Sequence, residues 1–152
     1  MENLNPIFEM KIPKKISEKT KPRKTRNDKK HPIKFPVNEN IQMKFRQSLI
    51  RFKRIYPHVQ MTQTVYNTLL LSYALSNESI INWTMPYKGS KLYMTTKILE
   101  EVYRQTIGGE NGLTIRKGLT DSKVAYYLTV SALLYIEKRG LYSEILQQAK
   151  YY

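Results

Sequence analysis

The chain has 152 residues, which is room for one compact domain or for two very small units that share a core, and is too short for a multidomain enzyme. Its 26 Lys and Arg residues outnumber 12 Asp and Glu residues, giving a formal charge of +14. Such an excess of positive charge points to a polyanionic partner, with nucleic acid as the first candidate. The absence of cysteine excludes disulfides, thiolate nucleophiles and Cys-ligated zinc, and is compatible with a reducing compartment.

Neither the first residues nor the apolar stretches of the chain indicate export or a membrane-spanning segment. The first ten residues, MENLNPIFEM, lack the apolar run of a secretory signal. The longest apolar stretches, around residues 69–71 and 132–136, are far shorter than the roughly 20 residues that span a bilayer. We therefore expect a soluble, cytoplasmic protein.

Residues 11–30 form a basic segment with ten Lys and Arg residues against two acidic ones, two prolines and almost no apolar content. Such a segment cannot bury a core, so residues 1–31 are predicted to be a disordered arm. The arm is either a solubilising tail or a DNA-binding segment that follows phosphates or enters a minor groove. The overall charge favours the second interpretation, with Lys29 and Lys30 as phosphate contacts.

A first strand and two helices are predicted over residues 32–76. Ile33, Phe35 and Val37 alternate with Lys34 and Pro36, the period of a strand with one buried face, and the proline restricts that strand to an edge or a two-stranded ribbon. A helix capped by Asn38 follows from Glu39 to Tyr56, where apolar residues recur at helical spacing, and Pro57 ends it. Thr62 opens the second helix, which runs to about Leu75.

The same order returns after a linker at residues 77–90. Leu92 and Met94 alternate with Lys91, Tyr93 and Thr95, which predicts a strand, and a helix is expected from about Thr96 to Ile107. The stretch GGENGLTIRKG is predicted to be a connector. Thr120 then opens a helix that Gly140 closes, and residues 141–152 form a helical tail after the second unit at 91–140.

An internal repeat underlies this order. A shift of 58 positions places FRQSL on YRQTI and MTQTVYNTLLLSYAL on LTDSKVAYYLTVSAL without a gap, and the alternative is chance similarity between helices. The identical pairs fall at surface, cap and core positions, namely Arg46/Arg104, Gln47/Gln105, Thr62/Thr120, Leu70/Leu128, Ala74/Ala132 and Leu75/Leu133. The strands align better at a shift of 57, which places Lys34 on Lys91 and keeps Phe35/Leu92 and Val37/Met94 inward.

These residues resemble a known family. A short strand followed by two helices, the second opened by [Met/Leu]-Thr-x-[Thr/Ser], is similar to the ribbon-helix-helix DNA-binding proteins, of which the Arc and MetJ repressors are examples. The resemblance covers residues 33–75 and 91–138. It implies a mostly α fold in which two repeats pair their strands into an antiparallel β-ribbon that enters the major groove. Because both repeats lie in one chain, an internal dimer is expected, hence a monomer with pseudo-two-fold symmetry.

The resemblance also assigns site residues. The outward strand positions become Lys34 and Pro36 with Lys91 and Tyr93, and those with polar groups, Lys34, Lys91 and Tyr93, are the predicted base contacts. The starts of the second helices become phosphate sites formed by Thr62, Gln63 and Thr64 and by Thr120 and Ser122. Asp121 departs from the pattern because its charge repels a phosphate, and it is assigned to stabilise the helix dipole.

Other chemistry finds little support. His31 and His58 lie at no ligand spacing, Glu100 and Glu101 are interpreted as surface charge, and no P-loop is present. We therefore expect no enzyme activity, no metal and no cofactor. The numerous tyrosines could stack bases of single strands, although most are better explained as core residues, and Trp83 is interpreted as a lid on the core rather than a partner contact.

The predicted function is sequence-specific binding of double-stranded DNA. The protein would act as a transcriptional repressor of a plasmid or mobile element, or as a relaxosome accessory protein that assists a relaxase or other transfer protein. A pair of helix-turn-helix or winged-helix units, and an antitoxin-like adaptor that binds another protein, are the alternatives.

Overall fold

The computed structural model describes residues 29–150, so residues 1–28 of the arm predicted to be disordered lie outside the described part of the chain. The end of that prediction is wrong, because Lys30 and His31 belong to the first strand. In chain order the elements are strand β1 (Lys30–Pro36), helices α2 (Glu39–Ile55) and α3 (Gln63–Ser76), a 3₁₀ turn (Glu78–Ile80), strand β2 (Tyr93–Leu99), and helices α4 (Glu100–Thr106), α5 (Leu113–Lys117), α6 (Asp121–Arg139) and α7 (Tyr142–Lys150). Over these residues the fold is mostly helical with one two-stranded antiparallel sheet, which confirms the predicted fold class at this level.

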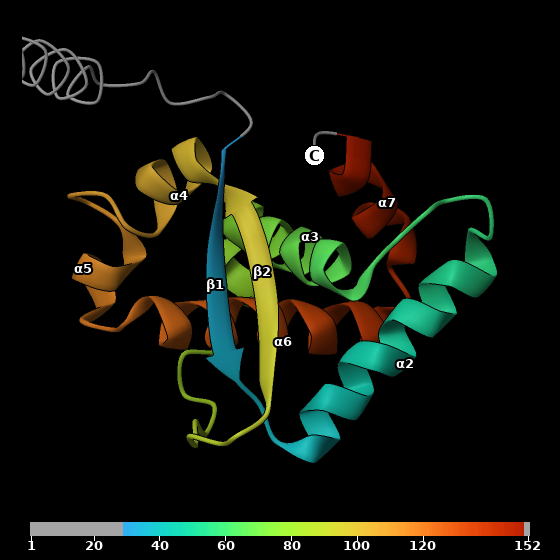
Figure 1. The fold of residues 1–152 in the computed structure, drawn as a ribbon, viewed down its shortest axis with the longest axis horizontal. Helices are drawn as coiled ribbons and strands as arrows, with labels where there is room; N and C mark the ends of the chain where they lie inside the picture. The colour runs from blue at the N-terminus through green and yellow to red at the C-terminus, as the bar shows by residue number, and fades with distance from the viewer. Residues whose placement is uncertain (1–28, 151–152) are drawn as a thin grey trace, which may run out of the picture.

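The two strands form a ribbon in front of two crossing helices (Figure 1). They pair antiparallel, with Lys34 opposite Thr95 near the centre. Side chains alternate across the ribbon, so one face is buried and the other is open to solvent. The buried face consists of Ile33, Phe35, Met94, Thr96 and Ile98, of which Ile33, Phe35 and Met94 were predicted inward.

Helices α3 and α6 make the layer behind the ribbon, and they pack on each other. Each also packs on the strand that comes from the other half of the chain: α3 lies against β2 and α6 against β1. Both helices are therefore buried over most of their length, including Tyr66 and Leu70 of α3 and Leu128 and Leu133 of α6. The ribbon cannot bury its apolar face without both helices.

Helix ends agree closely with the sequence signals. Asn38 caps α2 by accepting a hydrogen bond from the Ile41 N–H, and α2 ends before Pro57. Thr62 and Thr120 cap α3 and α6 in the same way. Gly140 ends α6 in the left-handed conformation, at φ 65°, which costs a residue without a Cβ little.

The predicted start of the second strand and helix is wrong. Lys91 and Leu92 precede β2, and the helix expected from Thr96 begins only at Glu100. The alternation seen at Met94 continues through Thr96 and Ile98, whose side chains are buried against the helices behind the ribbon. Pairing with β1 thus extends the strand over residues that could equally have started a helix.

Two further predictions need correction. Pro36, expected on the outer face, is buried, as are its neighbours Phe35 and Val37, so the alternation of exposed and buried side chains along β1 ends at Phe35. The stretch predicted as a simple connector contains the short helix α5, whose Leu113 is buried. The expected helical tail is present as α7. No helix of residues 29–150 has the length and apolar character to cross a membrane.

Candidate nucleic-acid interface

The solvent face of the ribbon carries cationic, hydroxyl and aromatic groups side by side. Its exposed side chains are Lys30, Pro32, Lys34, Tyr93 and Lys97, with Thr95 half-buried between them. Tyr93 is 56% exposed, which is unusual for so large a side chain. Every one of these positions follows from the two-residue period of a strand whose opposite face is in the core.

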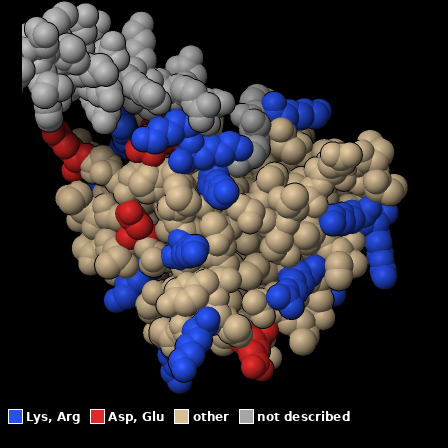
Figure 2. Space-filling model, in the orientation of Figure 1, with Lys and Arg blue, Asp and Glu red and all other residues tan. Residues whose placement is uncertain are grey.

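Basic side chains prevail over acidic ones on this face of the molecule (Figure 2). Figure 2 shows Lys and Arg over the ribbon and over α2, with few acidic groups among them. Ammonium groups on an exposed ribbon can donate hydrogen bonds to phosphate oxygens or to guanine O6 and N7. The arrangement therefore suits a polyanion with hydrogen-bond acceptors.

The start of α6 lies directly against the edge of β1. Thr120 accepts a hydrogen bond from the Lys123 N–H, and the Ser122 hydroxyl donates to the Lys34 carbonyl oxygen at 2.7 Å. The first N–H groups of a helix have no partner within the helix, so those of Asp121 and Ser122 are available to an anion beside the ribbon. Ser122 is thus placed by its side chain and can bind an anion only through its backbone.

The start of α3 flanks the opposite strand. In Figure 1 α3 begins on the β2 side of the ribbon and α6 on the β1 side. Asn67 donates to the Thr95 carbonyl oxygen at 3.2 Å, and the Thr68 hydroxyl accepts from the Lys97 N–H at 2.8 Å. Both outer edges of the ribbon are therefore hydrogen-bonded to the helix beside them.

The three residues predicted as a phosphate site on α3 differ in what they offer. Thr62 is exposed, and its hydroxyl accepts from the Val65 N–H. Gln63 turns its amide inward, donating to the Phe45 carbonyl oxygen and to Asn67. Thr64 is half-buried. An anion at this helix end would meet the backbone N–H groups of Gln63 and Thr64 rather than the Gln63 side chain.

Most of the residues predicted for the exposed face of the ribbon lie there together, but Lys91 does not. Lys30, Lys34 and Tyr93 share the exposed face, and Lys29 lies exposed just before β1. Lys91 is exposed but lies in a bend before the strand. Lys97 lies on the exposed face instead, and the sequence prediction missed this residue because it expected a helix from Thr96 onward. The alternation of Met94, Thr96 and Ile98 was the available signal.

A polar and aromatic network joins the beginning of β1 to α4 and α6. The His31 ring stacks on Tyr103, with ring centres 3.6 Å apart, and its Nδ1 donates to Glu100 at 2.8 Å. The Tyr103 hydroxyl donates to Asp121 at 2.7 Å. The hydrogen bond from His31 holds the pKa of Glu100 below its ordinary value.

This network corrects two expectations. Glu100 is a partner of His31 rather than plain surface charge, and Asp121 is occupied by Tyr103 as well as lying in the first turn of α6. Burial, followed by the hydrogen bond to Asp121, raises the pKa of Tyr103 to about 12, so its hydroxyl remains a donor at neutral pH. The network holds the beginning of the ribbon to the helices on its β1 side.

The aromatic residues in the linker and in α6 form a packed cluster. Trp83 is partly buried and packs on Tyr127, with ring centres 5.7 Å apart, while the Lys117 ammonium lies 4.9 Å from the Trp83 ring centre. Tyr126 is buried, and its hydroxyl donates to the Pro86 carbonyl oxygen. The cluster is consistent with Trp83 as a lid and offers no row of open rings for stacking bases.

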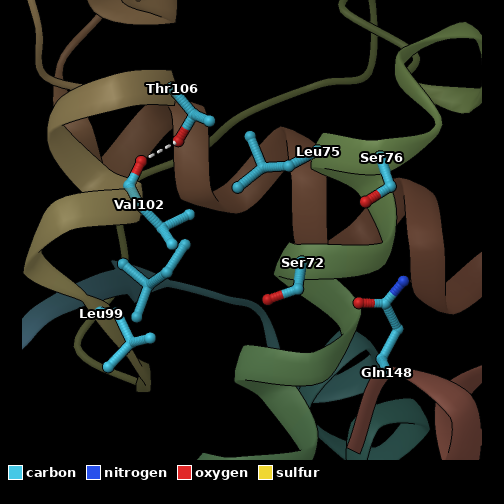
Figure 3. Close-up of a pocket in the computed structure, with 8 residues that line it drawn as sticks. Ser72, Leu75, Ser76, Leu99, Val102, Thr106 and Gln148 are labelled. Carbon is cyan, nitrogen blue, oxygen red and sulfur yellow. Dashed lines mark hydrogen bonds between the residues drawn. The ribbon is translucent and has the colours of Figure 1, made fainter. Parts of the chain in front are cut away.

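A groove between α3, α4 and α7 has a volume of about 270 Å³ (Figure 3). Its apolar wall includes Leu75, Leu99 and Val102, with Ser72 and Gln148 adding polar groups. No titratable side chain lines it, so it offers no acid–base chemistry. Within residues 29–150 no three His, Cys, Asp or Glu side chains are grouped to hold a metal ion.

No protein-family model, curated protein or solved structure matches this chain. The assignment of function therefore rests on the ribbon face and the two helix starts beside it.

Proposed function

We propose that the protein binds double-stranded DNA without catalysing a reaction, by placing the exposed face of its β-ribbon in the major groove. The observation that carries the proposal is the juxtaposition of that face, with Lys34, Lys97 and Tyr93, and the starts of α3 and α6 on either side of it. Ribbon side chains would contact base edges, and the helix starts would hold phosphates on the two walls of the groove.

The dimensions support this placement. Two paired strands are about 5 Å apart, and the major groove is about 12 Å wide, so a ribbon with its side chains fills the groove. Lys34 and Lys97 are suited to guanine, and Tyr93 and Thr95 can donate to or accept from other base edges. The excess of 26 basic over 12 acidic residues supplies the nonspecific electrostatic attraction.

We further propose that the chain is an internal dimer of two ribbon-helix-helix-like repeats. Support comes from the crossed packing, in which α3 lies on β2 and α6 lies on β1. Lys34 and Thr95 pair next to the middle of the ribbon, and each of these residues has its carbonyl oxygen bonded by a helix on its own side. A pseudo-two-fold axis through this pair would relate Lys34 to Thr95, and not to Lys91 as the sequence alignment has it.

Burial argues against α3 or α6 as a recognition helix in a helix-turn-helix arrangement. A recognition helix needs an exposed face to enter the groove. Eight of the 14 residues of α3 are buried, and the 19-residue α6 is buried from Val124 to Leu133 apart from Tyr127. The ribbon, in contrast, exposes one complete face.

The physiological role we propose is regulation of a plasmid or mobile element, as a repressor or as a relaxosome accessory protein. Selecting bound sequences from a pool of random duplexes would separate these roles. A preferred site beside the protein's own promoter would support repression, and a site beside a transfer nick would support the accessory role and an interaction with a relaxase.

The test of DNA reading compares three lysine variants on a selected site and on a scrambled duplex at one salt concentration. Lys34→Ala and Lys97→Ala should each cost about 1 to 3 kcal/mol on the selected site and much less on scrambled DNA, because a base contact discriminates between sequences. Lys91→Ala is the matched control, exposed but outside the strand, and should change both duplexes little and equally. Equal losses on both duplexes for Lys34→Ala and Lys97→Ala would refute the ribbon as the reading element.

A further inference from the structure

We propose that the bound duplex continues past the ribbon along α2, whose basic side chains contact phosphates that flank the site. The DNA footprint would then be lopsided, extending further on the α2 side than on the side of α4 and α5. This inference rests on the proposed DNA binding and assigns to α2 a phosphate-binding surface that the resemblance to ribbon-helix-helix proteins does not imply.

The first support is the charge of α2. The helix has five basic residues against one acidic residue, Glu39, which lies in its first turn. All five basic side chains are exposed: Lys44, Arg46, Arg51, Lys53 and Arg54. Arg51 contacts Glu137 of α6 at 3.3 Å. Like charges crowded on one helix repel each other, and a line of phosphates would relieve that repulsion.

The opposite side of the ribbon is electrostatically different. Residues 100–117, which span α4 and α5, contain three acidic and three basic residues. Two of the basic ones have acidic neighbours: Arg104 contacts Glu100 and Arg116 contacts Glu78, each at 3.5 Å. This side therefore attracts DNA much less than α2 does, and the asymmetry gives the footprint a direction.

The start of α2 lies at the end of the ribbon, so DNA bound to the ribbon can reach α2. The Val37 N–H donates to the Leu92 carbonyl oxygen at 3.0 Å, so strand pairing continues to within one residue of the Asn38 cap and ties the start of α2 to the end of the ribbon. In Figure 2 the basic side chains over α2 are visible on the same face as those over the ribbon. DNA that lies on the ribbon thus passes beside α2 without any rearrangement of the protein.

Geometry limits the extent of the contact. A helix of 17 residues is about 25 Å long, which equals roughly seven base pairs at 3.4 Å per pair. The outermost stripe of α2 also exposes Met43 and Ile50, at 57% and 50%. These apolar side chains cannot bind phosphate, so the contacts would come from the basic residues that border the stripe. Docking of another protein on this stripe is the competing outcome.

The experiment uses the full chain on a duplex that carries the selected site at its centre with long flanks. Arg46→Gln, Lys53→Gln and Arg54→Gln are combined in one variant, which leaves the Arg51 pair intact. The matched control removes three charges from the other side through Arg104→Gln, Arg116→Gln and Lys117→Gln. Hydroxyl-radical footprints and the slope of log K against log salt are measured for both, after circular dichroism shows that they are folded.

We expect the α2 variant to lose protection on one flank only and to lower the salt slope by up to about 2.7, from about 0.9 for each lost phosphate contact, with sequence preference unchanged. The control should keep the wild-type footprint. Trimming the duplex tests the wild-type chain alone: removing base pairs from the α2 flank should weaken binding more than removing them from the other flank.

Equal footprints and slopes for the two variants would overturn the inference while leaving DNA binding by the ribbon in place. A changed sequence preference in the α2 variant would also overturn it, because α2 would then read bases. Failure of the wild-type chain to bind any duplex would instead overturn the proposed function itself, so the two failures are distinguishable.

Discussion

The buried hydroxyl pair of Ser48 and Tyr66 joins α2 to α3 inside the core. The two oxygens are 2.6 Å apart, and both side chains are fully buried. Burial raises the pKa of Tyr66 well above its ordinary value, so the phenol stays neutral and its hydrogen bond persists at any physiological pH. This hydrogen bond, together with the packing of Phe52 on Tyr66, joins α2 to α3.

Replacing both members of the pair should cost less than the sum of the two single replacements. Ser48→Ala leaves the buried Tyr66 hydroxyl without its partner, and Tyr66→Phe does the same to the Ser48 hydroxyl. Each variant should lower the free energy of unfolding by about 1 to 3 kcal/mol. The double variant should lose less than the sum of the two, because neither polar group is then stranded. Urea unfolding measures all three, with the exposed Ser143→Ala as control. Strictly additive losses would show that the two hydroxyls do not stabilise each other.

At the scale of elements, the end of α6 depends on one glycine. Gly140 lies at φ 65°, and its N–H donates to the Ile136 carbonyl oxygen at 2.7 Å. A Cβ added there would meet no atom within 4 Å, so any cost of a side chain comes from the backbone alone. The same turn directs the chain from α6 into α7, which packs on α3.

Gly140→Ala should therefore destabilise the protein by about 1 kcal/mol, the cost of placing an L-residue in the left-handed region. Gly89→Ala is the matched control, because its surroundings are equally open and its φ is not in that region. It should be neutral or raise stability by up to about 1 kcal/mol through the unfolded state. Guanidinium unfolding curves compare the two variants, and identical midpoints would show that the left-handed conformation at residue 140 costs alanine nothing.

At the scale of the whole molecule, both strands of the ribbon come from one chain. Both outer edges of that ribbon are also occupied: Ser122 bonds the Lys34 carbonyl oxygen, and Asn67 and Thr68 bond backbone groups of β2. A further strand from a second molecule would have to displace these bonds. The core is likewise closed by α3 and α6 of the same chain.

We accordingly expect a monomer in the absence of DNA. Light scattering on a sizing column should give a mass near 18.0 kDa over a wide range of protein concentration. A stable species of about twice this mass would contradict the internal pairing of the two halves.

Local chemistry made the helix ends predictable from the sequence. Asn38, Thr62 and Thr120 cap helices with their own side chains, Pro57 cannot continue one, and Gly140 adopts a conformation that other residues avoid. Each of these signals acts within a few residues of itself. The inward positions of Ile33 and Phe35 were predictable for the same reason, because the alternation of a strand is visible in the sequence.

Local sequence signals were enough to predict α2, α3, α6 and α7, the basic charge and the presence of strands, whereas α5, the length of β2 and the residues that share its outer face depend on contacts between distant segments. Thr96 and Ile98 are compatible with a strand or a helix, and pairing with residues more than 60 positions away selects the strand. That choice moves Lys97 onto the ribbon and leaves Lys91 before it. Strand register depends on contacts between distant segments, which no local pattern contains, and a shift of a single residue would have turned every side chain of β2 to the other face.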